Sequence, residues 1–295
     1  MRTEPVFERV ALIGIGLIGS SMALALRKHG LARRVVCADH NPDHVAKALE
    51  LALVDEATVD LAAAVAGADL VVLCTPVGTL VELAAAIAPH CAPGAIVSDV
   101  GSVKELVVRE VGPHLPGNVH LVPAHPIAGT EHSGPTAGFA EVFEGRWCIL
   151  TPSDGTDRAA VGKVVEMWRR FGSMVEIMDA AHHDRVLAIT SHLPHLIAYS
   201  IVDTAVGLEK STQSEVIKFS ASGFRDFTRI AASDPVMWRD IFLNNREAVL
   251  DILQRFTEDL TALQRAIRRG EGDTLQDVFT RTRKIRRGII EAKQA

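Results

Sequence analysis

The sequence predicts an α/β protein: a Rossmann-type, doubly wound, mostly parallel sheet followed by an all-α C-terminal domain. Up to about residue 179, short β-branched apolar runs alternate with Ala- and Leu-rich helical stretches. A glycine-rich turn follows the first of these runs, and strand-like runs disappear after Asp179. Alternation of this kind is typical of right-handed crossovers between parallel strands. We therefore expect two domains, a dinucleotide-binding domain over 1–179 and a helical domain for substrate binding and dimerisation over 180–295.

The predicted strands are apolar runs of four to six residues, each short enough to be a buried parallel strand. They cover 10–15, 35–38, 70–74, 95–98, 119–122, 147–150 and 174–177. The helical stretches between them include 19–28, 79–88, 104–111 and 157–171.

One long helix is predicted over 235–270 in the C-terminal half. Asp234 is a good N-cap, Pro235 suits the first helical position, and Gly270 is a typical stop. Apolar residues recur in this helix at steps of four and three: Val249, Leu253, Phe256, Leu260, Leu263 and Ile267. Such a seam needs a helical partner, either the next helix (274–292) or a second subunit. We expect this half to form a homodimer.

Composition argues against several other classes of protein. The net charge of -5 disfavours nucleic-acid binding, and the basic run at 281–287 has the spacing of a solvated helix face. The four cysteines form no CxxC pair, which favours buried thiols in a reducing compartment. No signal peptide and no apolar run of membrane-spanning length are recognisable, so we expect a cytoplasmic protein that does not contact a membrane. The sequence 182–184, His-His-Asp, is interpreted as helix capping or surface polarity, and no metal site is predicted.

The cofactor site is predicted at the turn 14–19, which has the pattern GxGxxG between a strand and a helix. Gly14 makes the tight turn, Gly16 lets a pyrophosphate approach the backbone, and Gly19 lets the helix pack on the strand. The intervening Leu17 and Ile18 complete the loop. Phosphate oxygens would lie at the helix N-terminus, where free N–H groups attract anions.

A carboxylate at the end of the next strand predicts which dinucleotide is bound. Asp39 lies twenty residues after Gly19, where it can accept hydrogen bonds from both ribose hydroxyls and repel a 2′-phosphate. The predicted cofactor is therefore NAD, although a cationic His40 could tolerate a phosphate. Thr75 and Pro76 end the strand at 70–74 and are expected to line the cofactor groove.

Three polar clusters are candidates for the substrate site. The first contains Ser102 within 99–104, the second opens with His125 and extends to 134, and the third spans Ser191 to His195 in a helix. The first two follow predicted strands, and ligands bind beyond the carboxyl ends of parallel strands. An imidazole and a hydroxyl near a nicotinamide suggest oxidation of an alcohol.

Two arginines supply possible anion anchors. Arg225 and Arg229 are four residues apart, so a continuous helix would place them on one face. Paired guanidinium groups suit carboxylate binding, but exposed arginines that pair with Asp226 or Glu215 explain the pattern equally well.

Together these segments resemble the prephenate/arogenate (cyclohexadienyl) dehydrogenase family over essentially the whole chain. The segments that carry the resemblance are GIGLIGSS, DVGSVK, HPIAGTEHSGP, SHLPH and GFRDFTRIAASDPVMWRDIF. The resemblance implies NAD-dependent oxidative decarboxylation of prephenate to 4-hydroxyphenylpyruvate, or of arogenate to tyrosine.

The resemblance also implies roles for individual residues. His125, Ser102 and Ser191 would be catalytic, with His125 bonded to the ring hydroxyl. Arg229, assisted by Arg225, would anchor a carboxylate. The remaining residues would contact substrate or wall its pocket: Thr130, Glu131, His195 and Trp238.

Two alternatives remain at the level of sequence. One is a β-hydroxyacid-type dehydrogenase, which relies on a lysine in its helical half; Lys210 and Lys218 lie in that half but in no comparable polar cluster. The other is an NAD-sensing protein without catalysis, which would not need the converging polar residues.

Overall fold

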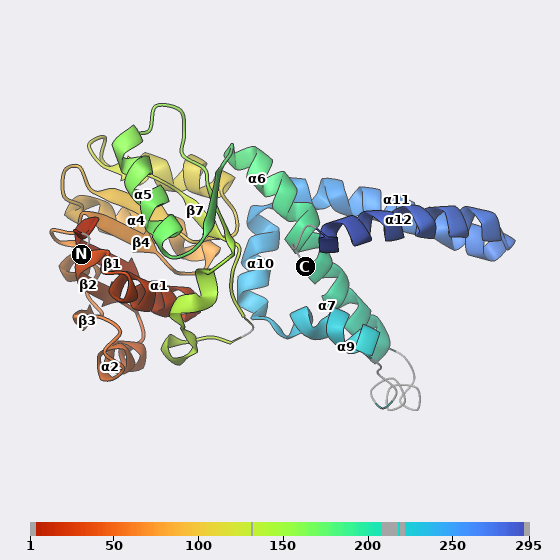
Figure 1. Ribbon diagram of the computed structural model, residues 1–295, viewed down its shortest axis with the longest axis horizontal. Helices are drawn as coiled ribbons and strands as arrows, with labels where there is room; N and C mark the ends of the chain where they lie inside the picture. Colours follow the sequence, from red (N-terminus) through yellow and green to blue (C-terminus); the bar gives the residue numbers. More distant parts are fainter. Residues whose placement is uncertain (1–3, 131, 208–217, 219–221, 292–295) are drawn as a thin grey trace. The chain divides into compact units, whose positions relative to one another are not determined.

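The computed structural model describes residues 4–130, 132–207, 218 and 222–291. Its main sheet has six parallel strands in the order β3-β2-β1-β4-β5-β6, the arrangement of a Rossmann fold (Figure 1). The strands are β1 (Phe7–Ile13), β2 (Ala32–Ala38), β3 (Glu56–Thr58), β4 (Leu70–Leu73), β5 (Ile96–Asp99) and β6 (His120–Leu121). The predicted fold class is confirmed. The strand β3 was not predicted, because its three residues contain no apolar run.

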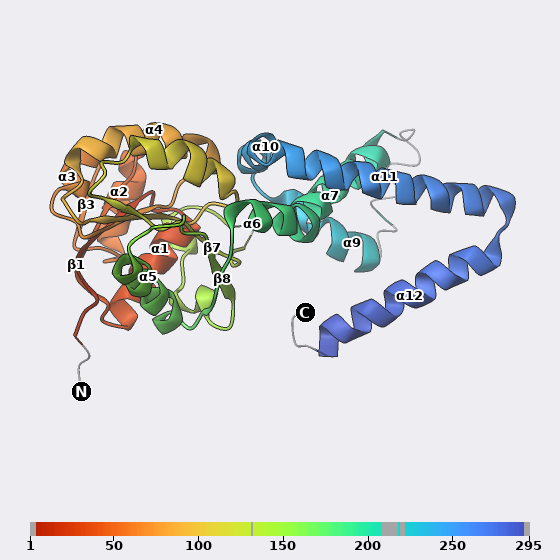
Figure 2. The same cartoon turned by 90° about the horizontal axis from the view of Figure 1, so that it is seen from above.

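Helices cover both faces of this sheet. In Figure 2, α3 (Leu61–Val65) and α4 (Leu80–Ile87) lie on one face, and α1 (Leu17–Lys28) and α5 (Arg158–Arg170) lie on the other. The side chains of β1 alternate accordingly: Val10 and Leu12 pack in the core with α1 and α5, whereas Ala11 and Ile13 pack with α3 and α4. A further helix, α2 (Pro42–Glu50), follows β2.

A second sheet has three strands and packs into the same hydrophobic core as one face of the first. Its strands are β7 (Ala124–Pro126), β8 (Trp147–Leu150) and β9 (Met174–Ile177), with β7 antiparallel and β9 parallel to β8. The strands at 147–150 and 174–177 have the predicted bounds, but we expected them in the doubly wound sheet. The strand β7 was expected to be a loop, because three residues that include a proline do not form a strand-like run.

Short helical turns connect these elements. They are η1 (Val77–Thr79), η2 (Ala88–His90), the π-helical turn η3 (Val107–Val111), η4 (Gly112–His114), η5 (Pro135–Ala137) and η6 (Ala140–Phe143).

From residue 180 the described chain is helical. The elements are α6 (Ala180–Leu187), the π-helical turn η7 (Ala188–His192), α7 (Leu193–Val206), α9 (Ser222–Thr228), η8 (Arg229–Ala232), α10 (Pro235–Asn244), α11 (Arg246–Arg269) and α12 (Gly272–Glu291). The Asp234 carboxylate caps α10 by accepting the N–H groups of Val236 and Met237, as predicted. The single helix predicted over 235–270 is wrong, because the chain leaves helical geometry at Asn245 (φ -105°, ψ 33°).

The chain divides into two compact units, one up to Arg246 and one from Glu247 onward. The division predicted at residue 179 stays a prediction. In the second unit the predicted apolar seam of α11 is only partly covered. Val249 is buried, Leu260 and Ile267 are 54% and 66% exposed, and the other three seam residues are half-buried: Leu253, Phe256 and Leu263. Phe279 and Ile285 of α12 are also exposed.

One continuous helical stretch among the described residues, Ala180–Val206, is long and apolar enough to cross a membrane by length and composition alone. The prediction that no run reaches that length was therefore wrong. Core helices of soluble proteins pass the same test, and this stretch buries His183 and Asp184 completely against other parts of the same unit.

Candidate active site

The glycine turn between β1 and α1 is shaped for a phosphate group. Gly14 has φ +95°, and a Cβ there would lie 2.9 Å from the Cys74 carbonyl oxygen. A Cβ on Gly19 would collide with the Gly14 carbonyl oxygen, whereas a Cβ on Gly16 would meet no described atom within 4 Å. Gly16 is the N-cap of α1 and makes no side-chain cap, and Leu17 and Ile18 open the helix. The turn therefore leaves room beside an uncapped helix N-terminus, which fits the pyrophosphate of a dinucleotide.

Asp39 directly follows β2 and is tied to this turn. Its carboxylate accepts the Ile15 N–H at 3.0 Å and the Asn41 N–H at 2.9 Å. The Nδ1 atoms of His40 and His44 each lie 3.4 Å from Asp39 Oδ1. His44 was not anticipated, because it lies in the first turn of α2 and only the fold brings it back to β2. A fixed carboxylate beside the glycine turn fits the ribose of NAD.

Thr75 and Pro76 lie where β4 ends. The Thr79 hydroxyl donates to Thr75 Oγ1 and to the Pro76 carbonyl oxygen, both at 2.9 Å, and so fixes this corner. The Thr75 methyl group lies next to the Gly14 backbone, so the corner adjoins the predicted cofactor site.

A fully buried ion pair braces the loop that carries Ser102. The Lys104 ammonium group donates to the Asp99 carboxylate and, at 2.9 Å, to the Ala124 carbonyl oxygen. Asp99 also accepts the N–H groups of Gly101 and Ala124, at 2.8 and 3.3 Å. Burial raises the pKa of Asp99, and Lys104 and the two backbone donors oppose that rise. The pair joins the end of β5 to β7, with half-buried Ser102 on the loop between Asp99 and Lys104.

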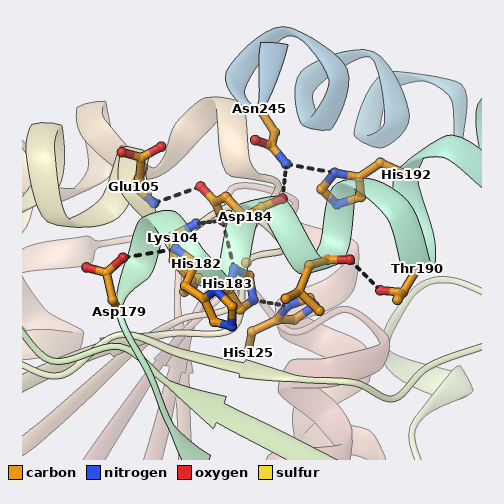
Figure 3. Close-up of polar contacts among 12 residues, drawn as sticks. Lys104, Glu105, His125, Asp179, His182, His183, Asp184, Thr190, His192 and Asn245 are labelled. Atoms are coloured by element: carbon orange, nitrogen blue, oxygen red, sulfur yellow. Dashed lines mark hydrogen bonds and ion pairs between the residues drawn. The ribbon is translucent and has the colours of Figure 1, made fainter. Parts of the chain in front are cut away.

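His125 is the central residue of β7 and is buried. Its Nδ1 lies 2.8 Å from His183 Nε2, and His183 Nδ1 lies 2.7 Å from Asp184 Oδ1 (Figure 3). Burial lowers the pKa of His125 well below its usual range, and the nearby His183, Lys104 and His192 lower it further. At neutral pH the His125 imidazole is therefore uncharged and can accept a proton.

Asp184 is fixed from two sides. Its carboxylate accepts the backbone N–H groups of Lys104 and Glu105, at 2.8 and 2.9 Å. The Asn245 side chain donates to the Asp184 carbonyl oxygen at 2.9 Å and contacts His192 Nδ1 at 3.0 Å. Burial lowers the pKa of His192 to about 4, so this imidazole is also neutral. The break between α10 and α11 thus places an amide beside the π-helical turn η7 (Figure 3).

A second group of residues lies at the junction of η7 and α7 in the same helical stretch and includes Trp238 of α10. His195 Nδ1 lies 2.9 Å from the Ser191 carbonyl oxygen, and its ring stacks on Trp238 with centroids 3.6 Å apart. Burial lowers the pKa of His195, the hydrogen bond with the Ser191 carbonyl oxygen raises it, and the positive charge of Arg229 lowers it. An arginine, a neutral imidazole and an indole together suit a carboxylate-bearing ring.

The comparison with known families agrees with this geometry. Residues 22–177 match the family model of the prephenate dehydrogenase nucleotide-binding domain, and residues 179–281 match that of the prephenate dehydrogenase dimerization domain. The chain belongs to the prephenate dehydrogenase family.

Individual relatives support the same assignment. The chain is similar to the cyclohexadienyl dehydrogenase of Zymomonas mobilis, with 43% identity over 95% of this chain and 96% of the relative. It is 32% identical to the prephenate dehydrogenase of Bacillus subtilis over 96% of this chain and 76% of the relative. Among solved structures, the prephenate dehydrogenase of A. aeolicus, in complex with hydroxyphenyl propionate and NAD+, gives a TM-score of 0.88 at 36% identity, covering 96% and 98% of the two chains.

Membership of the prephenate dehydrogenase family sets aside both sequence-level alternatives. The family is one of NAD-dependent oxidoreductases, so neither a β-hydroxyacid dehydrogenase nor a non-catalytic sensor is needed to explain the residues. Lys218 of the first alternative is exposed, and Lys210 lies outside the described residues.

The fold brings some of the family's predicted site residues together and leaves others at the surface. Ser102 and His125 both belong to segments tied to Lys104, and His195 stacks on Trp238. Thr130 is exposed on a turn, where its hydroxyl accepts the His132 N–H at 3.3 Å. The arginine pair is split between two elements: Arg225 is in α9 and Arg229 opens η8, and both side chains are exposed. Glu131 lies outside the described residues.

Sequence reasoning missed the partners of His125. His183 and Asp184 were interpreted as helix capping or surface polarity, and this was wrong: both are buried, and only the neighbouring Asp179 caps α6. The available signal was an ionisable His-Asp pair in an otherwise apolar helical stretch. His192 and Asn245 gave no signal, because their contact depends on how α10 meets η7.

Proposed function

We propose that this chain oxidises the hydroxyl-bearing ring carbon of prephenate, arogenate or both with NAD+, with loss of the ring carboxylate as CO2. The observation that carries the proposal is the buried, neutral imidazole of His125, held on β7 beside the braced loop of Ser102. The glycine turn and Asp39, which follow β1 and β2 of the six-stranded sheet, supply the dinucleotide site.

Bound NAD+ supplies the acceptor for the hydride that leaves C4 of the ring. The residues of the chain control the rest of the reaction. His125 accepts the proton of the C4 hydroxyl while the hydride departs, and returns it to the phenol oxygen after CO2 leaves C1. No net proton is consumed, because the aromatic product keeps its hydroxyl group. Since the lowered pKa keeps His125 unprotonated at neutral pH, this base is ready to act.

The other predicted residues orient the substrate in this proposal. Ser102 hydrogen-bonds the reacting hydroxyl, and Ser191 lies across the site. Arg229, assisted by Arg225, binds a substrate carboxylate, since guanidinium groups bind carboxylates in bidentate fashion. His195 and Trp238 wall the ring, and Thr130 and Glu131 lie toward the side-chain end.

The variant His125→Asn tests the role of the base. The amide group of asparagine can still donate a hydrogen bond toward His183. It has no basic nitrogen that could accept the proton of the substrate hydroxyl. We expect NAD+ binding, measured by calorimetry, to be unchanged and kcat to fall by about 10²–10⁴-fold. The variant His182→Asn changes an exposed neighbour of His183 and is the control. Near-normal turnover of His125→Asn would remove His125 from the reaction.

Substrate choice is tested by measuring kcat/KM for prephenate and for arogenate side by side, with NADH absorbance as the signal. The relative from Zymomonas mobilis is named a cyclohexadienyl dehydrogenase, which favours use of both substrates. A difference larger than about 10³-fold, roughly 4 kcal/mol of discrimination, would contradict dual use.

We also propose a cytoplasmic homodimer. The four cysteines are unpaired in the structure, as expected in a reducing compartment. Residues 179–281 match a dimerization domain, and the exposed side chains of Leu260 and Ile267 in α11 offer an apolar surface. Sedimentation should show a dimer, and Leu260→Glu with Ile267→Glu should shift it toward monomer. An unchanged sedimentation coefficient in that double variant would place the interface elsewhere.

A further inference from the structure

We propose that His183 and Asp184 are positioning residues that hold His125 in the one tautomer able to act as a base. This inference rests on the proposed function of His125. The three side chains form a series in which His125 contacts His183 and His183 contacts Asp184 (Figure 3).

The direction of each hydrogen bond follows from the carboxylate end of the series. Asp184 is an acceptor, because its oxygens already accept the Lys104 and Glu105 backbone N–H groups. The proton between Asp184 and His183 must therefore be on His183 Nδ1, which leaves a lone pair on His183 Nε2. His125 Nδ1, 2.8 Å from that lone pair, must then carry the second proton. Neutral His125 consequently has its own lone pair on Nε2, the nitrogen that faces away from His183.

Each partner is held firmly enough to impose this order. His183 and Asp184 are 0% and 1% exposed, so no water competes for their hydrogen bonds. The two imidazole rings meet edge to face with their centroids 5.1 Å apart, and this geometry directs His125 Nδ1 toward His183 Nε2. Asp184 is fixed to the backbone beyond β5, and Asn245 fixes the carbonyl oxygen of the same residue.

The same arrangement stabilises the protonated intermediate state of His125. When His125 Nε2 takes a proton, the hydrogen bond from His125 Nδ1–H to His183 becomes charge-assisted. Charge-assisted hydrogen bonds are shorter and stronger than hydrogen bonds between neutral groups. The Asp184 carboxylate lies one ring away and offsets the new positive charge. This is the logic by which a carboxylate orients an imidazole base in other enzymes, here with a second imidazole between them.

A simpler interpretation is that Asp184 only caps the helix that begins near Glu105 and that His183 fills the core. Replacing Asp184 would not separate the two ideas, because it would also release two backbone N–H groups. The test is therefore placed on His183, which makes no described hydrogen bond other than those to His125 and Asp184 through its side chain.

Two variants of His183 differ only in the group offered to His125. His183→Gln keeps a carbonyl oxygen that can accept the His125 Nδ1–H, whereas His183→Leu has a similar volume and no acceptor. We expect His183→Leu to lower kcat by at least about 10-fold, and by at most the roughly 10⁴-fold seen when a catalytic histidine is left in the wrong tautomer. KM for NAD+ should not change, and His183→Gln should recover most of the kcat. His182→Leu, at the exposed neighbouring position, is the matched control.

The tautomer itself can be read without any assay of activity. In protein labelled with ¹⁵N-histidine, long-range proton–nitrogen correlation spectra distinguish a protonated Nδ1 from a protonated Nε2. We expect His125 of the wild type to be protonated on Nδ1, and the signal to move toward the Nε2 form in His183→Leu.

The outcomes separate this inference from the proposed function. If the wild type does not oxidise prephenate or arogenate, the proposed function fails. If the wild type is active and His125→Asn is not, but His183→Leu has wild-type kcat, only the role of His183 is overturned. A wild-type His125 protonated on Nε2 would overturn it as well, even if His183→Leu failed to fold.

Discussion

The substitution Lys104→Met tests how far the active site depends on the buried ion pair. It removes the ammonium group from Asp99 and the hydrogen bond to the Ala124 carbonyl oxygen, while an unbranched apolar side chain of similar length remains. Both side chains of the pair are 0% exposed, so Asp99 would be left as a buried charge without its counterion.

The expected loss follows from that burial. Removing one partner of a buried ion pair costs about 3–5 kcal/mol, because the desolvated charge left behind is uncompensated. For a unit of this size each kcal/mol corresponds to about 2–4 °C in Tm, so we expect Tm to fall by roughly 6–20 °C. The double variant Asp99→Asn with Lys104→Met leaves no buried charge and should recover most of the loss.

The effect of pH has a definite sign. In Lys104→Met the pKa of Asp99, already raised by burial, is no longer opposed by Lys104. Asp99 then stays protonated in the folded state at a pH where the unfolded chain has released that proton. Stability of the variant therefore falls as pH rises above the unfolded pKa of about 3.9, and its deficit against the wild type is smallest in acid.

Differential scanning calorimetry at several pH values measures these shifts. Lys28→Met, which breaks an exposed pair of contacts with Glu141 and Glu144, is the control and should change Tm little. A Tm of Lys104→Met within error of the wild type, or a double variant no more stable than the single one, would refute the reasoning.

Three further predictions concern the base and the cofactor. Because the pKa of His125 is lowered, kcat/KM should stay high as pH falls through about 6.5 and drop only in stronger acid; a half-maximal value at or above that pH in the pH profile would contradict this. Gly16→Ala should weaken NAD+ binding in calorimetry with little change in Tm, whereas Gly19→Ala should lower both, since only the second Cβ collides with the backbone; equal Tm losses would argue against this geometry. Asp39→Asn should lower the ratio of kcat/KM for NAD+ to that for NADP+ by about 10-fold or more, since roughly 1.4 kcal/mol is lost with one charged contact; an unchanged ratio would exclude Asp39 as the selecting residue.

Much of the nucleotide-binding half was predictable from local sequence. Buried parallel strands are continuous apolar runs, and the glycine turn is a local steric requirement, so strands, turn and Asp39 could all be read in order along the chain. The strand β7 could not be read, because it has three residues and ends in a proline. The break at Asn245 could not be predicted either, because apolar residues continue at helical spacing on both sides of it.

The sequence by itself determined the fold class, the glycine turn and the carboxylate at the end of β2, and it predicted His125 as the base. Each of these depends on residues that are close in the chain. Only the tertiary structure decided what surrounds His125, because His183 is 58 residues away along the chain and Lys104 is 80 residues from Asp184. A buried polar side chain is stable only with a partner, and which partner it finds depends on how strands and helices pack, not on the residues beside it.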